Sequence, residues 1–142
     1  MASRNEEIVR TACQVIWTEG QIDRVAEFYH PDFKADYPNT NWGQGLDGVR
    51  ALAANVRVGL PDYRESIDLL IDGGEYIVVE LTIRGTHNGP LAGLEATGKE
   101  IAFRDVTILR IKDDRIIEQR GLTDHLSVFM QLGLSTLPGS AR

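Results

Sequence analysis

The chain has little cysteine, no long hydrophobic run and no excess of positive charge. Its 142 residues include a single cysteine, Cys13, which excludes an intramolecular disulfide and any metal site built from several cysteines. The N-terminal segment has no apolar run of the length that a signal peptide or a transmembrane helix needs. We therefore expect a cytoplasmic protein that does not insert into a membrane.

The charge balance argues against nucleic acid as a partner. The formal net charge is −6, and no cluster of Lys and Arg could follow a phosphate backbone. The sequence also lacks a G-x-S-x-G elbow, a Gly-rich phosphate loop and an H-E-x-x-H motif. Its histidines, His30, His87 and His125, are too dispersed to indicate a zinc site. We expect neither a metal nor a cofactor.

What the chain does contain is typical of a globular protein. Hydrophobic residues make up 42% of it and charged residues 25%, and its length suits one hydrophobic core rather than two. We predict a single domain over residues 1–142. Within it, the segment 134–142 shows no hydrophobic period and is expected to form a loose tail.

Hydrophobic periodicity divides the chain into helices and a set of long strands. Helical spacing of apolar residues predicts helices at 4–18, 21–29, 47–59 and 124–132. Alternation with a period of two predicts strands at 31–38, 63–71, 76–87, 99–112 and 115–122. Helices followed by an antiparallel meander indicate an α+β fold in which the sheet covers the helices. A curved sheet of this kind leaves an apolar cavity in which chemistry could take place.

Two polar residues interrupt the apolar face of the strand at 99–112. Its alternating positions are apolar except for Asp105 and Thr107, with Phe103 beside them. Burying a carboxylate on such a face costs free energy unless the group is paired or protonated. Asp105 is therefore a candidate for catalysis, and Thr107 and Phe103 are candidates for substrate binding. The alternative for Asp105 is a buried ion pair, for example with Arg120.

Three further residues are candidates for the edge of a pocket. His87 continues the inward positions of the strand at 76–87 and would lie at its end. The alternative is that His87 only orders the turn that follows. Tyr37 precedes a stretch rich in turn formers and Trp42 lies within it, where functional loops are common, although aromatic residues more often belong to the plain core or its rim.

Asp124 stands where the last strand ends and the last helix begins. Asp is a preferred N-cap residue, so capping is one interpretation. Thr123 could cap the helix equally well and leave Asp124 to face a pocket as a catalytic carboxylate. His125 would point away from Asp124 by about 100°, and we assign it to the surface. A cavity shared by Asp105 and Asp124 would favour acid/base catalysis, whereas an exposed, capping Asp124 would favour a binding role.

Three motifs give the sequence a resemblance to a known family. They are "YHPDF" after the N-terminal helices, "GTHNGPLAGLEATGK" between two strands, and "VTILRIKDDRIIEQRGLTDHLSVFMQLG" at the end. Over about Glu6 to Gly133 the chain resembles the SnoaL-like polyketide cyclases, a branch of the NTF2-like superfamily. The resemblance implies a cone-shaped α+β fold, in which a curved, mixed or antiparallel sheet wraps around N-terminal helices and encloses an apolar pocket. It also implies a homo-oligomer, a dimer or a tetramer.

The resemblance further implies a chemistry. The characterised cyclases close a ring by intramolecular aldol condensation without a cofactor, and their catalytic aspartate matches Asp124 by its distance from the final Gln-Leu-Gly. A carboxylate whose pKa is raised by an apolar pocket could take a proton from a methylene flanked by carbonyls. The expected substrate is a small apolar carbonyl compound, with Asp124 and Asp105 as the catalytic acids.

The sequence departs from the family pattern at three positions. Asp105 and Thr107 stand where the cyclases have glutamine and histidine, and Ala35 stands where they have a pocket asparagine. Two alternatives therefore stay open. The protein could be a cofactor-less hydroxylase or isomerase of the same family, or a non-catalytic module that binds a small apolar ligand, since a fold does not dictate a function.

Overall fold

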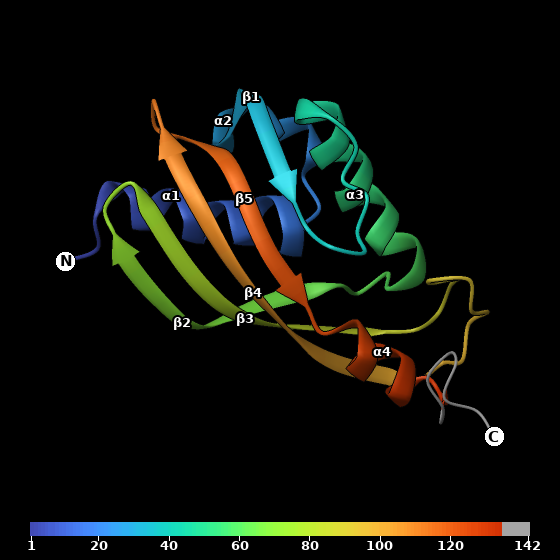
Figure 1. The fold of residues 1–142 in the computed structure, drawn as a ribbon. Helices are drawn as coiled ribbons and strands as arrows, with labels where there is room; N and C mark the ends of the chain where they lie inside the picture. The colour runs from blue at the N-terminus through green and yellow to red at the C-terminus, as the bar shows by residue number, and fades with distance from the viewer. Residues whose placement is uncertain (135–142) are drawn as a thin grey trace.

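A curled five-stranded sheet with helices against its concave side is the framework of the molecule (Figure 1). The computed structural model describes residues 1–134. The strands lie in the order β1-β5-β4-β3-β2, with the bounds β1 Tyr29–Asp36, β2 Arg64–Gly73, β3 Tyr76–Thr86, β4 Glu100–Lys112 and β5 Arg115–Thr123. The pair β1 and β5 is parallel and the other pairs are antiparallel. The predicted α+β class with a mixed sheet is confirmed.

The helical segments are α1 Arg4–Ala12, η1 Cys13–Thr18, η2 Ile22–Arg24, α2 Val25–Phe28, α3 Gly45–Gly59 and α4 His125–Gln131. The helix predicted at 4–18 is present, but at Cys13 it changes to the wider π-helical turns of η1, a feature that is frequent at functional sites. The helix predicted at 21–29 is shorter than expected. It ends at Phe28 because Tyr29 already pairs with Ile116 of β5.

The core lies between the concave face of the sheet and α1, η1 and α3. Val9, Ile16 and Val49 from the helices are completely buried, as are Ile77 and Val79 from β3. The strands β3 and β4 pair without a bulge, so their odd-numbered side chains all face inward. The alternation predicted for these strands is confirmed.

Strand β2 departs from the predicted alternation. The sequence pattern placed Leu69 and Ile71 on the same face as Tyr63 and Ile67, but Leu69 and Ile71 are more than half exposed, whereas Tyr63 is buried. A β-bulge between Ile67 and Leu69 shifts the pairing with β3 by one residue. One extra residue reverses the face of every later side chain. Leu70 therefore packs against the core, and Leu69 and Ile71 lie on the outer face.

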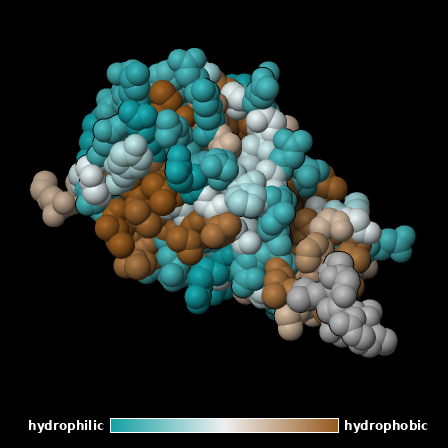
Figure 2. Space-filling model, in the orientation of Figure 1, coloured by the Kyte–Doolittle hydropathy of each residue, from teal (hydrophilic) through white to brown (hydrophobic). Residues whose placement is uncertain are grey.

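Exposed hydrophobic side chains gather on the convex face of the sheet. In the space-filling view, a hydrophobic patch lies left of the centre of the molecule (Figure 2). The strand register places two neighbouring rows on this face, namely Leu69–Glu80–Val106–Leu122 and Ile71–Val78–Ile108–Arg120. We call the exposed hydrophobic residues of these rows the outer patch: Leu69, Ile71, Val106, Ile108 and Leu122. A contiguous apolar patch of this kind is typical of an interaction surface.

Within residues 1–134, no helix is both long and apolar enough to span a lipid bilayer. The loose tail predicted for 134–142 lies outside the described residues from position 135 onward.

Candidate active site

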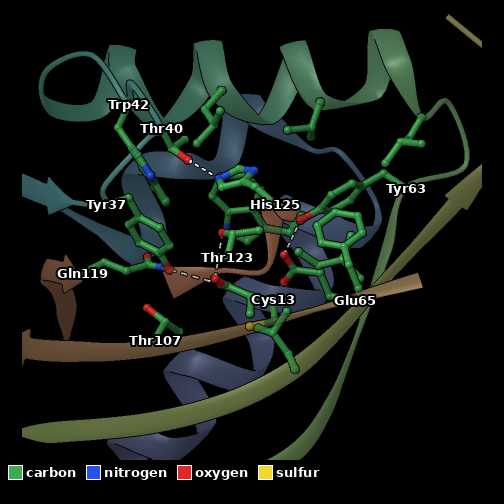
Figure 3. A pocket seen from close by; sticks show the side chains of 18 of the residues that line it. Cys13, Tyr37, Thr40, Trp42, Tyr63, Glu65, Thr107, Gln119, Thr123 and His125 are labelled. Atoms are coloured by element: carbon green, nitrogen blue, oxygen red, sulfur yellow. Dashed lines mark hydrogen bonds between the residues drawn. The ribbon is translucent and has the colours of Figure 1, made fainter. Parts of the chain in front are cut away.

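A mostly apolar cavity of about 190 Å³ lies between the concave face of the sheet and the helices. Side chains of α1, η1, α3 and α4 line it together with strands from β1 to β5 and the loop after β1. Polar side chains interrupt the apolar wall in three groups (Figure 3). One group surrounds Asp105, one surrounds Glu65, and the third is the pair of Thr40 and His125.

Asp105 of β4 lies in the wall of this cavity and is 7% exposed. Its Oδ1 accepts a hydrogen bond from the Thr123 hydroxyl at 2.9 Å, and its Oδ2 accepts one from the Tyr37 hydroxyl at 3.2 Å. Burial raises the pKa of Asp105 above its ordinary value, and the two hydrogen bonds oppose that rise. The alternative of an ion pair is not realised among the described residues, because Arg120 is exposed and no cation is among the groups that shift the pKa of Asp105. A buried carboxyl without a cation beside it suits proton transfer.

Tyr37 is held against Asp105 by neighbours on both sides. The Gln119 Nε2 donates to the Tyr37 hydroxyl at 3.3 Å, and burial raises the pKa of Tyr37, so the hydroxyl keeps its proton. Tyr37 can approach β5 because Gly121 has no side chain, since a Cβ there would lie 2.7 Å from the Tyr37 hydroxyl oxygen. Trp42 packs on Tyr37 with ring centroids 5.2 Å apart.

Two buried polar atoms in this group have no hydrogen-bond partner among the described residues. They are the indole Nε1 of Trp42, a donor, and the Oε1 of Gln119, an acceptor. Both residues line the cavity. Buried polar groups are usually paired, so these two atoms are candidate partners for a molecule bound in the cavity.

The other residues predicted on β4 also face the cavity. Thr107 is 2% exposed and its hydroxyl donates to the backbone carbonyl of Arg120 at 3.1 Å. Phe103 lines the apolar wall. Together with Asp105, Tyr37 and Trp42, they bring five of the seven predicted site residues into one cavity. Their contact with a substrate stays a prediction.

Glu65 of β2 forms a second polar group that the sequence analysis missed. Its Oε2 accepts a hydrogen bond from the Tyr63 hydroxyl at 2.6 Å, and the Cys13 thiol lies beside the carboxyl (Figure 3). Burial raises the pKa of Glu65 to about 8, with a smaller contribution from the charge of Asp105, and the Tyr63 bond opposes the rise. Glu65 is therefore mostly protonated at neutral pH. The sequence could have indicated this position, because Glu65 is spaced by two residues from both Tyr63 and Ile67 and so lies on the same face of the strand.

The positions of Asp124 and His125 are the reverse of those predicted. Asp124 is exposed, caps α4 by accepting a hydrogen bond from the backbone N–H of Ser127 at 3.0 Å, and does not line the cavity. His125, which we had assigned to the surface, lines the cavity, with its Nε2 at 3.1 Å from the Thr40 hydroxyl. Neighbouring helical residues differ by about 100° in direction, so only one of them faces inward. Asp124 therefore does not share the cavity of Asp105, and its catalytic role stays a prediction.

His87 is buried beneath the loop that joins β3 to β4, and it does not line the cavity. Its Nδ1 accepts from the backbone N–H of Thr97 at 3.2 Å and lies 3.0 Å from the Thr97 hydroxyl. Its backbone N–H donates to the carbonyl of Lys99, and its carbonyl accepts from the N–H of Gly98. The returning loop covers the strand end and keeps His87 out of the cavity, and its role in substrate binding stays a prediction. The alternative, that His87 orders this turn, fits the structure.

The arrangement as a whole is suited to proton transfer in an apolar cavity. Two carboxyls, one held by Tyr37 and Thr123 and the other by Tyr63, face the same space. Among residues 1–134, no group of three or more His, Cys, Asp or Glu side chains is placed to hold a metal ion.

The family model of the SnoaL-like polyketide cyclases matches residues 7–132. The chain belongs to this family. Aklanonic acid methyl ester cyclase DnrD from Streptomyces peucetius is 29% identical to it, over 82% of this chain and 83% of its own. Aklanonic acid methyl ester cyclase DauD from Streptomyces sp. strain C5 is 32% identical, over 82% of this chain and 74% of its own. The solved structure of TsrD from Streptomyces laurentii has the same fold, with a TM-score of 0.82 at 23% identity, covering 92% of this chain and 95% of the other. The predicted family and its fold are confirmed.

Proposed function

We propose that this SnoaL-like protein is a cofactor-independent acid/base enzyme that closes a ring in a small, apolar, polyketide-derived carbonyl compound by an intramolecular aldol reaction. The observation that carries the proposal is the Asp105 carboxyl, buried in an apolar cavity with no cation beside it among residues 1–134. The similarity to aklanonic acid methyl ester cyclases supports the type of reaction. In this proposal Asp105, rather than Asp124, is the base.

The proposed reaction begins with proton removal. The Asp105 carboxylate takes a proton from a methylene between two carbonyls, for which an apolar surrounding makes it a stronger base than in water. The indole N–H of Trp42 is free to donate to the enolate oxygen that forms. Hydrogen bonds from Tyr37 and Thr123 keep the carboxyl in place during the transfer.

Ring closure then needs no further reagent. The enolate carbon attacks a ketone carbon of the same molecule, a carbon–carbon bond forms, and the ketone oxygen becomes an alkoxide. The alkoxide takes the proton back from Asp105, so the product has the same composition as the substrate. The cavity walls hold the substrate folded and thereby remove much of the entropic barrier to cyclisation.

Turnover by matched variants tests this proposal. Wild type, Asp105→Asn and Asp124→Asn are compared on a small diketo ester that can close one ring. Asp105→Asn keeps the shape of the side chain but not the base, and we expect turnover to fall at least about 100-fold. Asp124→Asn is expected to keep most of its turnover. Unchanged turnover in Asp105→Asn contradicts the proposal, and a loss confined to Asp124→Asn assigns the base to Asp124.

A non-catalytic binding module is the second candidate, and the exposed position of Asp124 favours it. Asp124 is the residue that matches the family's catalytic aspartate, yet it faces away from the cavity. A binding module predicts a bound apolar ligand without turnover and tolerance of both Asp→Asn variants. Mass spectrometry of any product also separates ring closure, which keeps the mass, from hydroxylation, which adds one oxygen atom.

We further infer that the chain assembles as a homo-oligomer, a dimer or a tetramer, through the outer patch. Each of its residues is at least 38% exposed, and the rows run across β2 to β5 with Glu80 and Arg120 as their charged members. A second copy of the same face would bury this surface on both partners.

A further inference from the structure

Asp105 and Glu65 stand apart on the concave face of the sheet. Asp105 of β4 pairs with Leu81 of β3, and Glu65 of β2 pairs with Ile83 of β3. Their backbones are therefore separated by two strand spacings, about 10 Å, across the sheet and by two residues, about 7 Å, along it. The apolar side chains of Leu81, Ile83 and Phe103 line the wall between them.

Glu65 has the features of a group that binds a ligand. Tyr63 occupies one carboxyl oxygen, Oε2, and the side chain is only partly buried and lines the cavity. None of the neighbours that shift its pKa is a cation, so an ion pair does not explain its burial. With a pKa of about 8 the carboxyl carries a proton at neutral pH, and a protonated carboxyl is a donor suited to a carbonyl oxygen.

The Asp105 side of the cavity presents complementary groups. Asp105 is an acceptor when ionised, the Gln119 Oε1 is an acceptor, and the Trp42 Nε1 is a donor, the last two without partners among the described residues. A ligand with one oxygen function at each end and an apolar body between them would satisfy both ends.

The volume of the cavity limits the size of that body. About 190 Å³ is little more than the roughly 150 Å³ of an apolar cavity that holds one benzene ring. One ring or two fused rings therefore fit. Three or four fused rings would require the walls to move apart.

We propose that Glu65 is a second ligand-binding residue, which donates a hydrogen bond to a ligand oxygen at the end opposite Asp105, and that the cavity takes mono- or bicyclic compounds with an oxygen at each end. The inference rests on the proposed function for the role of Asp105. It deepens that function by naming the size and polarity of the substrate. The Glu65 hydrogen bond would polarise a substrate carbonyl as Asp105 removes a proton.

Binding of three bicyclic probes tests the inference without any turnover. The probe 6-hydroxy-1-tetralone carries oxygens at both ends, 5,6,7,8-tetrahydro-2-naphthol lacks the ketone, and 1-tetralone lacks the phenol. Calorimetry at about pH 6.5 measures each against wild type, Glu65→Gln and Glu65→Leu. Glu65→Gln keeps a hydrogen-bond donor at this position, whereas Glu65→Leu has a side chain of similar volume without a donor.

We expect wild type to bind 6-hydroxy-1-tetralone about tenfold more tightly than the probe without the ketone. Glu65→Gln should keep most of this ratio and Glu65→Leu should lose it. An unchanged ratio in a folded Glu65→Leu overturns the inference. Failure of all three probes to bind wild type at millimolar concentration overturns it as well.

The pH dependence of 1-tetralone binding gives a readout in case Glu65→Leu does not fold. The titratable groups around Glu65 are Tyr63, Cys13 and Tyr29, and the cavity wall also holds Asp105 and His125. Burial raises the pKa of the two tyrosines and of the thiol well above their ordinary values, and Asp105 and His125 are common to wild type and Glu65→Gln. We expect the dissociation constant of wild type to rise about tenfold from pH 6.5 to about pH 9, and that of Glu65→Gln to stay constant. Equal pH profiles of the two proteins overturn the inference.

These outcomes are independent of the cyclase assay. If the preference for the probe with the ketone depends on Glu65 but the protein shows no turnover, the proposed ligand class stands and the proposed reaction is contradicted. If turnover depends on Asp105 but not on Glu65, and wild type binds the probes with and without the ketone equally, the proposed reaction stands and the role of Glu65 is contradicted.

Discussion

At the scale of single residues, Glu65 gives the fold a pH dependence opposite to that of a salt-bridged carboxylate. Its pKa is about 8 in the folded chain against an ordinary value of 4.5, so between these pH values the folded state holds a proton that the unfolded state has released. The free energy of unfolding therefore decreases as the pH rises through this window. Above it, Glu65 adds no further dependence.

Glu65→Gln should remove this dependence. We expect the free energy of unfolding of the variant, relative to wild type, to increase by on the order of a few kcal/mol between about pH 5 and about pH 8.5. Urea titrations at these two pH values measure the difference. Glu95→Gln, which removes an exposed carboxyl from the loop between β3 and β4, is the control. A pH-independent difference for Glu65→Gln would show that the carboxyl is solvated in the folded chain.

The exposed cap at Asp124 makes a separate prediction about stability. Asp124→Ala removes the hydrogen bond to the Ser127 N–H and should lower the free energy of unfolding by about 1 kcal/mol. Asp124→Asn should leave it nearly unchanged, because Asn caps helices as well as Asp does. Chemical unfolding of the two variants measures both values. Equal stability of Asp124→Ala and wild type would mean that the hydrogen bond from the Ser127 N–H to Asp124 does not stabilise the helix.

At the scale of elements, the pairing of β4 with β5 depends on Gly121. A Cβ at this position would lie 2.5 Å from the carbonyl oxygen of Val106 and 2.7 Å from the Tyr37 hydroxyl oxygen. Gly121→Ala should therefore push Tyr37 away from Asp105 and lower the free energy of unfolding by about 1–3 kcal/mol. Thermal unfolding and ligand binding measure the two effects. Leu122→Ala, at the next and outward-facing position, is the control and should affect binding little.

The sequence predicts the structure correctly where the alternation of inward and outward side chains continues without interruption. The inward faces of β3 and β4 could be predicted, and with them Asp105, because their pairing has no bulge. The faces of β2 beyond Ile67 could not, because one inserted residue reverses the alternation and no local pattern marks it. The same applies to the start of α4, where a shift of one residue decides between Asp124 and His125 for the inward position.

At the scale of the whole molecule, the sheet has two apolar faces with different environments. The concave face is covered by the helices and forms the cavity, whereas the convex face carries the outer patch. The bulge in β2 enlarges this patch, because it turns Leu69 and Ile71 outward. An exposed patch that crosses several strands is an interaction surface or a liability for aggregation, and assembly with a second copy removes the liability.

The outer patch therefore predicts the effect of a charge on assembly. Val106 lies near the middle of the patch, between Glu80 and Leu122 in the sheet, and is 41% exposed. Val106→Lys places an ammonium group in the proposed interface, where it would be desolvated without a partner. We expect wild type to sediment as a dimer or a tetramer and Val106→Lys to sediment as a monomer with an unchanged far-ultraviolet spectrum. Val58→Lys is the control, since Val58 is 55% exposed on α3, and it should assemble as wild type does. A wild type that sediments as a monomer at all concentrations would contradict the assembly, and an oligomeric Val106→Lys would place the interface elsewhere.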